Sequence, residues 1–93
     1  MPRPVLAKAG FQRAYRRLSA VERRVVDTAL RHFQRYLETR QASVGLGLKH
    51  VGGRTYEFRA GLALRIVYVL TETEVVLTLL GTHDDVRRFL KRQ

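Results

Sequence analysis

The sequence predicts an α+β domain in which a three- to four-stranded antiparallel sheet packs against an N-terminal helical hairpin, with a short helix at the C-terminal end. Two patterns carry this prediction. Apolar residues recur at helical spacing through residues 11–40, whereas apolar and polar residues alternate from residue 56 to residue 70, the two-residue period of strands. Residues 1–93 are predicted to form one domain, because this length supports a single modest core.

The helical hairpin is predicted from spacing and from a capping motif. Residues 4–8 are compatible with a short edge strand, where a proline is tolerated. Apolar side chains at positions 11, 14, 15 and 18 then share one face of a first short helix. Ser19 and Glu22 match a capping box, in which each side chain accepts a hydrogen bond from the other's backbone amide. A second helix is therefore predicted from this point to about Arg40.

The second half of the chain reads as a meander of strands followed by a helix. Residues 41–54 are predicted to be a loop, because they hold four glycines that mark turns. Strands follow over residues 56–59, 64–70 and 75–80, with a Gly61 turn and a polar turn between them, and such short connections imply antiparallel neighbours. Thr82 and Asp85 are suited to cap the last helix.

Charge is the most informative property of the composition. The chain has 18 Lys and Arg residues against 8 Asp and Glu residues, a formal net charge of +10, and only three of the cations are lysines. Such a field favours polyanionic partners, and the planar guanidinium is the better bidentate partner for phosphate. The competing interpretation of any single arginine is a solvated helix face.

Several classes of site are not expected. Without cysteine there are no disulfides, thiolate nucleophiles or cysteine-type zinc sites, which fits a cytoplasmic location. His32, His50 and His83 lack the close spacing of metal ligands, so neither a metal nor another cofactor is expected. No export signal and no apolar run of membrane-spanning length is visible, and no membrane partner is expected.

Four short strings carry a resemblance that covers the whole chain: residues 47–50 (GLKH), 56–59 (YEFR), 64–68 (LRIVY) and 81–85 (GTHDD). In this order they resemble the RelE/ParE superfamily of toxins from type II toxin–antitoxin systems. The resemblance implies a toxin neutralised by a cognate antitoxin. It further implies either a ribosome-dependent mRNA endonuclease, which we favour, or a ParE-like inhibitor of DNA gyrase.

The resemblance also implies roles for individual residues. Nucleases of this superfamily use no metal, and the 2′-hydroxyl of the mRNA attacks the adjacent phosphate. Arg65 matches the arginine that contacts the scissile phosphate, Arg59 matches a basic position, and His83 stands where some members have a catalytic histidine. The chain departs from the family pattern at three positions: Glu57 replaces a lysine of RelE, Phe89 replaces a catalytic tyrosine of some members, and Leu46 replaces a general-base glutamate of another subgroup.

The residues thus predict a candidate site with open alternatives. Its catalytic candidates are Arg65, His83, His50 and Arg59, and its candidates for binding nucleic acid are Lys49, Arg54, Arg87, Arg88 and Lys91. A guanidinium suits the charge that develops on a phosphorane-like transition state, and histidine exchanges protons near neutral pH.

Each candidate also has a structural interpretation. Strand alternation places Glu57, Arg59 and Arg65 on one face, so Arg65 can instead serve as a cross-strand salt bridge to Glu57. His83 can order the start of the last helix, and His50 can be a solvated loop residue. Tyr56, Phe58 and Tyr68 are interpreted as core residues rather than as a platform for base stacking.

The expected partners follow from net charge and from the resemblance. They are a cognate antitoxin, with an acidic and partly disordered segment that folds on the basic surface, and mRNA on the ribosome. DNA gyrase takes the place of mRNA and ribosome in the alternative.

Overall fold

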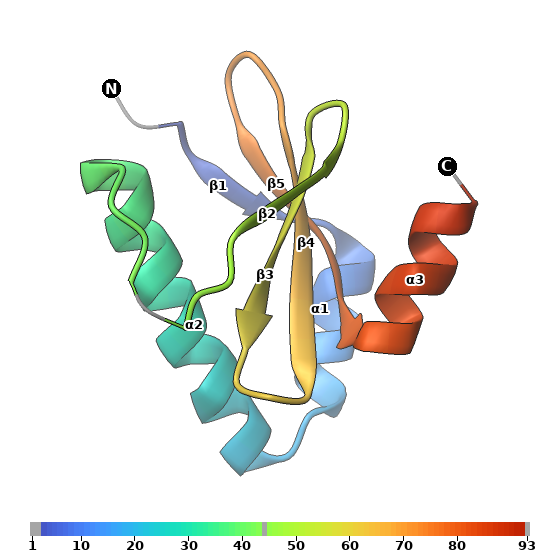
Figure 1. Ribbon diagram of the computed structural model, residues 1–93. Helices are drawn as coiled ribbons and strands as arrows, with labels where there is room; N and C mark the ends of the chain where they lie inside the picture. The colour runs from blue at the N-terminus through green and yellow to red at the C-terminus, as the bar shows by residue number, and fades with distance from the viewer. Residues whose placement is uncertain (1–2, 44, 93) are drawn as a thin grey trace.

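The computed structural model describes residues 3–43 and 45–92 and confirms the predicted α+β architecture. The elements in chain order are β1 (Val5–Ala7), α1 (Ala9–Arg17), α2 (Ala20–Thr39), β2 (Lys49–Gly52), β3 (Thr55–Ala60), β4 (Leu64–Leu70), β5 (Val75–Thr82) and α3 (His83–Lys91). Figure 1 shows the sheet at the centre, with α2 on one side and α3 on the other.

The sheet has the strand order β1-β5-β4-β3-β2, one strand more than the predicted maximum. Strands β3, β4 and β5 form the expected antiparallel meander, but β1 pairs parallel to β5 at the edge. The loop predicted over residues 41–54 is wrong for its second half, where β2 pairs with β3. The glycines on both sides of β2 hide this short strand in the sequence, and it forms because the edge of β3 offers free backbone hydrogen-bonding groups.

Two capping boxes begin the helices where the sequence predicts them. Ser19 Oγ accepts from the Glu22 amide and Glu22 Oε1 accepts from the Ser19 amide, at 3.1 and 2.9 Å. Thr82 and Asp85 form the same reciprocal pair at the start of α3. Helix α2 ends at Arg40, whose left-handed backbone (φ 63°) turns the chain away from the helix axis.

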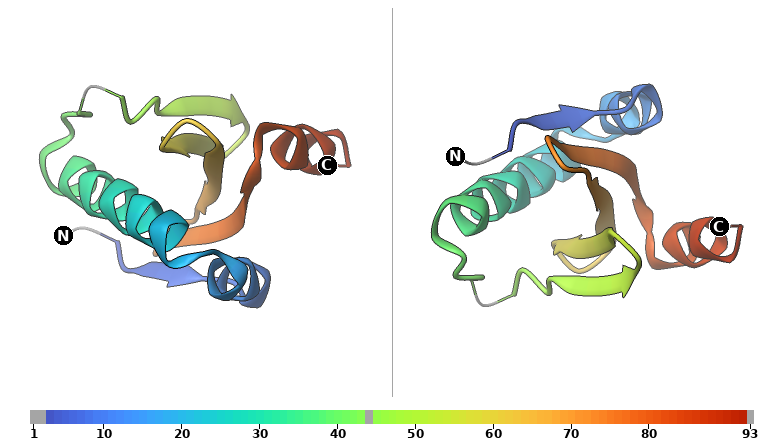
Figure 2. Two further views of the ribbon diagram at one scale, coloured as in Figure 1. Left: turned by 90° about the horizontal axis from the view of Figure 1, so that it is seen from below. Right: turned by 90° about the horizontal axis from the view of Figure 1, so that it is seen from above.

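The main core lies between the helical hairpin and one face of the sheet. Figure 2 shows α2 and α3 on opposite sides of the twisted sheet, and α1 packs against β5. Phe33 of α2 stacks on Phe58 with ring centroids 4.5 Å apart and contacts Tyr68 at 4.6 Å. Phe58 is 0% and Tyr68 2% exposed, which confirms both as core residues.

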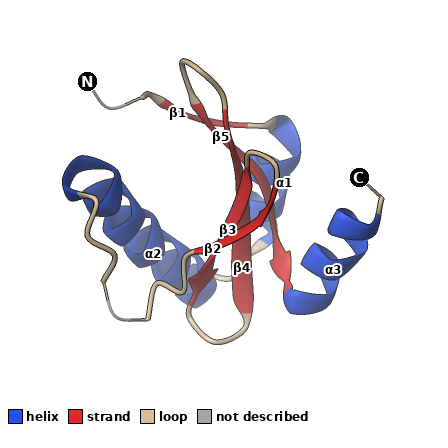
Figure 3. Cartoon of the chain, turned by 45° about the horizontal axis from the view of Figure 1, so that its top comes forward, coloured by secondary structure: helices blue, strands red, loops and turns tan. Residues whose placement is uncertain are grey.

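Helix α3 covers part of the other face of the sheet through contacts with β4 and β5 (Figure 3). Val67 of β4 and Val86 of α3 are buried there, separate from the main core. Within the described residues, no helix combines the length and hydropathy needed to cross a bilayer.

Candidate nucleic-acid interface

The candidate residues gather on the face of the sheet that α3 only partly covers. Glu57 pairs directly with Lys49 of β2, and Arg59 pairs directly with Arg65 of β4. Directly opposed residues of antiparallel strands share a face. Because Glu57 and Arg59 alternate along β3, all four side chains lie on one face, as the sequence predicts for Glu57, Arg59 and Arg65. We call Lys49, Arg59 and Arg65 the basic row.

Glu57 is the acidic member of this face and is only 5% exposed. Its Oε1 lies 3.5 Å from Nη1 of Arg65, whose side chain is 26% exposed. The predicted cross-strand salt bridge therefore exists, between diagonal neighbours. The other carboxylate oxygen, Oε2, is buried and has no hydrogen-bond partner among the described residues. A buried carboxylate with an unpaired oxygen is costly, so one acceptor on this face remains available to a hydrogen-bond donor.

Arg59 is held in place by the segment that precedes β2. The backbone amide of Arg59 donates to the carbonyl of Leu46 at 2.8 Å. Gly47 (φ 61°) passes so close that a side chain there would lie 3.0 Å from Nε of Arg59. Leu46 itself is 2% exposed and belongs to the main core. Leu46, where the resemblance implies a general-base glutamate in another subgroup, is thus a packing residue.

Glycine at position 81 shapes the end of the site near Arg65. Gly81 of β5 pairs directly with Arg65, and a Cβ on Gly81 would lie 2.7 Å from Cβ and Oδ2 of Asp85. The Asp85 side chain therefore packs directly over the backbone beside Arg65, where only glycine leaves room.

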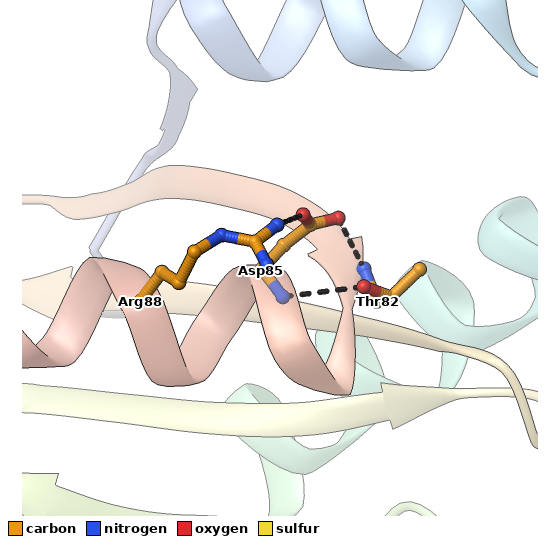
Figure 4. Close-up of polar contacts among 3 residues, drawn as sticks. All are labelled: Thr82, Asp85 and Arg88. Atoms are coloured by element: carbon orange, nitrogen blue, oxygen red, sulfur yellow. Dashed lines mark hydrogen bonds and ion pairs between the residues drawn. The ribbon is translucent and has the colours of Figure 1, made fainter.

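Asp85 is fixed in this position by hydrogen bonds at the start of α3. Figure 4 shows its carboxylate between the Thr82 amide, which donates to Oδ2 at 2.8 Å, and the guanidinium of Arg88, which donates to Oδ1. The hydrogen bond from the Thr82 amide, then that with its side chain, and to a lesser degree the charge of Arg88 lower the pKa of Asp85. Asp85 therefore stays ionised and neutralises part of the charge of Arg88.

His83 is the first residue of α3 and is exposed. It follows Thr82, which pairs with Leu64, so its backbone lies next to the end of β4 that carries Arg65. Its imidazole has no hydrogen-bond partner among the described residues, and the capping of α3 is performed by Thr82 and Asp85 instead. The remaining cations of α3 are exposed on the same side of the sheet: Arg87, Arg88 and Lys91.

Two of the predicted site residues lie elsewhere. His50 pairs with Tyr56, so it lies on the opposite face from Lys49. Its ring contacts that of Tyr56 at 4.9 Å and its Nε2 lies 2.7 Å from the carbonyl of Gly53. Arg54 is in the β2–β3 turn, where its carbonyl accepts from the amide of Leu70, at the far end of β4 from Arg65. Leu70 follows Arg65 by five positions along the strand, a distance of roughly 16 Å.

The structure adds two residues that the sequence did not place in the site. The sequence indicates Glu57 only as a partner of Arg65, yet it is the one buried acidic side chain of the face among the described residues. The sequence marks Gly81 only as the first residue of the string GTHDD, because the strand predicted over residues 75–80 ends before it, whereas in the structure β5 includes Gly81 and Asp85 packs against it. The arrangement offers three cations from three adjacent strands beside one buried carboxylate, which suits a phosphate that lies across the strands.

Comparisons with known proteins bear on the fold. No family model matches the chain, and a search of curated proteins finds no significant match. Solved structures do match. The toxin–antitoxin complex of DinJ and YafQ from E. coli contains a chain with a TM-score of 0.69 at 14% identity, covering 92% of this chain and 98% of that one.

Two further solved structures have the same overall fold as this chain. The RelB–RelE antitoxin–toxin complex from Methanococcus jannaschii gives a TM-score of 0.66 at 10% identity over 90% of this chain and 96% of the other. The YoeB/ParE toxin from Agrobacterium tumefaciens gives 0.66 at 15% identity over 86% and 98%. The coverage of both chains is nearly complete, so the similarity extends to the whole architecture.

Proposed function

We propose that this chain, which has the fold of the RelE/ParE superfamily, is the toxin of a type II toxin–antitoxin system. In the favoured form it is a metal-independent endonuclease that cleaves mRNA on the ribosome, in the cytoplasm. The observation that carries the proposal is the basic row, three cations from adjacent strands on one exposed sheet face of a highly cationic chain.

The chemistry assigned to the site is transesterification. The 2′-oxygen attacks the adjacent phosphorus, the bond from phosphorus to the 5′-oxygen breaks, and the products are a 2′,3′-cyclic phosphate and a 5′-hydroxyl. Arg65 and Arg59 stabilise the charge that develops on the non-bridging oxygens. His83 accepts the proton of the 2′-hydroxyl, and water supplies the proton of the leaving oxygen. Glu57 holds the guanidinium of Arg65 in place.

The basic surface of α3 extends the site along the nucleic acid. Arg87, Arg88 and Lys91 contact phosphates upstream or downstream of the cleaved bond, and they add affinity without sequence preference. His50 and Arg54 lie away from this surface and take no part in the proposed reaction.

The test is induced expression followed by primer extension on cellular mRNA. The wild type is expected to produce new cuts within translated regions. Arg65→Ala and His83→Ala are expected to lose these cuts, while the matched variant His50→Ala, on the face of the sheet opposite to Lys49, retains them. Circular dichroism of each purified variant separates loss of activity from loss of fold. If folded Arg65→Ala and His83→Ala remained fully toxic and cut mRNA normally, the nuclease assignment would be lost.

A second candidate is a ParE-like inhibitor of DNA gyrase that performs no chemistry. One observation favours it: the guanidinium of Arg65 is already paired with the carboxylate of Glu57. A supercoiling assay with purified gyrase distinguishes the candidates. Blocked supercoiling with intact mRNA supports the inhibitor, and unimpaired supercoiling with cleaved mRNA supports the nuclease.

Either form requires an antitoxin, because an uninhibited toxin would arrest its own cell. The proposed mode is an acidic segment that folds over the basic row and α3. Co-expression with the neighbouring gene of the operon is expected to yield a stable complex that dissociates at high salt. Recovery of only the free chain at low salt would contradict this partner.

A further inference from the structure

A cavity of about 320 Å³ opens on the face of the sheet opposite to the basic row, between the C-terminal end of α2 and the strands. Its walls include three of the four tyrosines of the chain, Tyr36, Tyr56 and Tyr68. Arg3 and Arg40 lie at the same cavity, together with the exposed Glu72. The proposed function does not use this cavity.

The ring faces of two of the three tyrosines, Tyr56 and Tyr68, are occupied by other aromatic side chains. Tyr56 and Tyr68 pair directly across β3 and β4, and their rings stack with centroids 5.3 Å apart and an interplanar angle of 15°. The ring of Tyr68 is further covered by Phe33 and Phe58. The rings of Tyr56 and Tyr68 therefore leave little room for base stacking, and their phenolic groups remain for a ligand.

The phenolic hydroxyls are free to donate. None of the three makes a hydrogen bond within the part of the chain that the structure describes, whereas the remaining tyrosine, Tyr15, donates to Oδ1 of Asp27 at 2.7 Å. Burial, and then the neighbouring Tyr36 and Tyr56, raise the pKa of Tyr68, while Arg40 opposes the shift. Tyr68 stays protonated at neutral pH and meets an anion as a donor.

The guanidinium groups add charge to these donors. Arg40 occupies the left-handed position that ends α2. Arg3 donates from Nε to the carbonyl of Glu72 at 3.3 Å, which anchors its side chain at the cavity. Two guanidinium groups against one carboxylate leave the cavity net positive. A cavity lined by both charged donors and neutral hydroxyl-bearing side chains matches an oxyanion with several acceptor oxygens.

We propose that this cavity binds a phosphate-type oxyanion, either inorganic phosphate or the phosphate group of a mononucleotide. Arg40 and Arg3 supply the charge, and the hydroxyls of Tyr36, Tyr56 and Tyr68 complete the coordination. The volume lies at the lower end of the range for small-molecule sites, in agreement with a compact ligand.

Tyrosine fluorescence provides a direct test, because the chain has no tryptophan and three of its four tyrosines line the cavity. The wild type is titrated at constant ionic strength with inorganic phosphate and, separately, with adenosine 5′-monophosphate. A saturable change is expected with both. Equal affinities identify the phosphate group as the whole ligand, and tighter binding of the nucleotide identifies a mononucleotide.

Matched variants decide whether the cavity is the site. Arg40→Gln and Tyr56→Phe are each expected to weaken binding by about tenfold, the loss of one good hydrogen bond to a charged group. Arg31→Gln, on an exposed position of α2 outside the cavity, is expected to leave the affinity unchanged. Absence of saturable binding, or equal losses in Arg31→Gln and Arg40→Gln, would overturn the proposal.

Discussion

Glu57 is the residue on which the proposed site depends most directly. It is buried, one of its oxygens pairs with Arg65, and the other has no partner among the described residues. Arg65 in turn lies directly opposite Arg59, a repulsive arrangement of like charges. The carboxylate therefore allows two arginines to share one small area of the sheet.

Glu57→Gln is expected to destabilise the fold by about 1–3 kcal/mol, because it leaves a partly buried guanidinium without an anion beside a like charge. Urea unfolding measures this change. The double variant with Arg65→Gln is the control, and a coupling of at least about 0.5 kcal/mol is expected between the two positions. A Glu57→Gln variant as stable as the wild type would mean that relief of desolvation outweighs the ion pair.

Gly81 and Gly10 give opposite predictions for the same substitution. At Gly81 an alanine Cβ would lie 2.7 Å from the Asp85 side chain, whereas at Gly10 in α1 its nearest neighbour would be the flexible end of Arg13 at 3.8 Å. Gly81→Ala is expected to destabilise by about 1–3 kcal/mol through this overlap. Gly10→Ala is expected to stabilise by up to about 1 kcal/mol, because alanine favours helix. Thermal unfolding of both variants checks the signs, and destabilisation by both would refute the steric argument.

At the scale of the element, α3 depends on its capping box for its position on the sheet. The hydrogen bond from the Thr82 amide lowers the pKa of Asp85 below its ordinary value of 3.8. A carboxyl with a lower pKa in the folded chain stabilises the fold above its unfolded pKa, and this contribution disappears as the pH falls through the folded value.

Asp85→Asn is therefore expected to be less stable than the wild type at about pH 6, with a difference that shrinks as the pH falls below 3.8 and through the lowered pKa of the folded state. Urea unfolding at a series of pH values measures the difference between the two proteins. Asp84→Asn is the matched control, since Asp84 lies next to Asp85 but takes no part in the capping box. A difference that grows on acidification would contradict the role assigned to the carboxylate.

The elements that the sequence predicts well are those whose signals are local. Ser19 with Glu22, and Thr82 with Asp85, mark helix starts that the structure confirms. The strand Lys49–Gly52 and the parallel pairing of β1 with β5 escape the sequence, because both depend on an edge provided by a distant segment. Local propensity cannot reveal such partners.

The same difference between local signals and distant partners decides which site residues the sequence places correctly. Alternation correctly places Glu57, Arg59 and Arg65 on one face, because these residues lie in long strands. The sequence predicts His50 as a loop residue that belongs to the same site. Because Lys49–Gly52 is a strand, the two-residue period instead places His50 on the face opposite to Lys49. The strand that the sequence does not predict, Lys49–Gly52, therefore accounts for the incorrect placement of His50.

At the scale of the whole molecule, the position of the charges matters as well as their sum. We expect the exposed cations of α3 to contribute more to RNA binding than those of α1, because α3 borders the basic row. Triple replacement by alanine in α3 is expected to lower the slope of log K against log salt by about 2 for single-stranded RNA. The residues are Arg87, Arg88 and Lys91.

The charge-matched control replaces three exposed arginines of α1, Arg13, Arg16 and Arg17. Fluorescence anisotropy with an RNA oligonucleotide at several salt concentrations compares the two triple variants. The α1 variant is expected to change the slope by less than about 1. Equal slopes in both variants would mean that RNA responds to the net charge alone.

The parallel pairing of β1 with β5 also affects the order in which the parts of the chain fold. Val5 pairs with Val75 and Ala7 with Leu77, so β1 can pair only after β5, the last strand in the described chain, has formed. Contacts this distant in sequence form late and slow the folding of a domain. The helical hairpin emerges early with its apolar face uncovered, and the sheet that covers it is complete only after β5 has been translated. A chain without β5 leaves β1 without a partner strand and the core between the helical hairpin and the sheet incomplete.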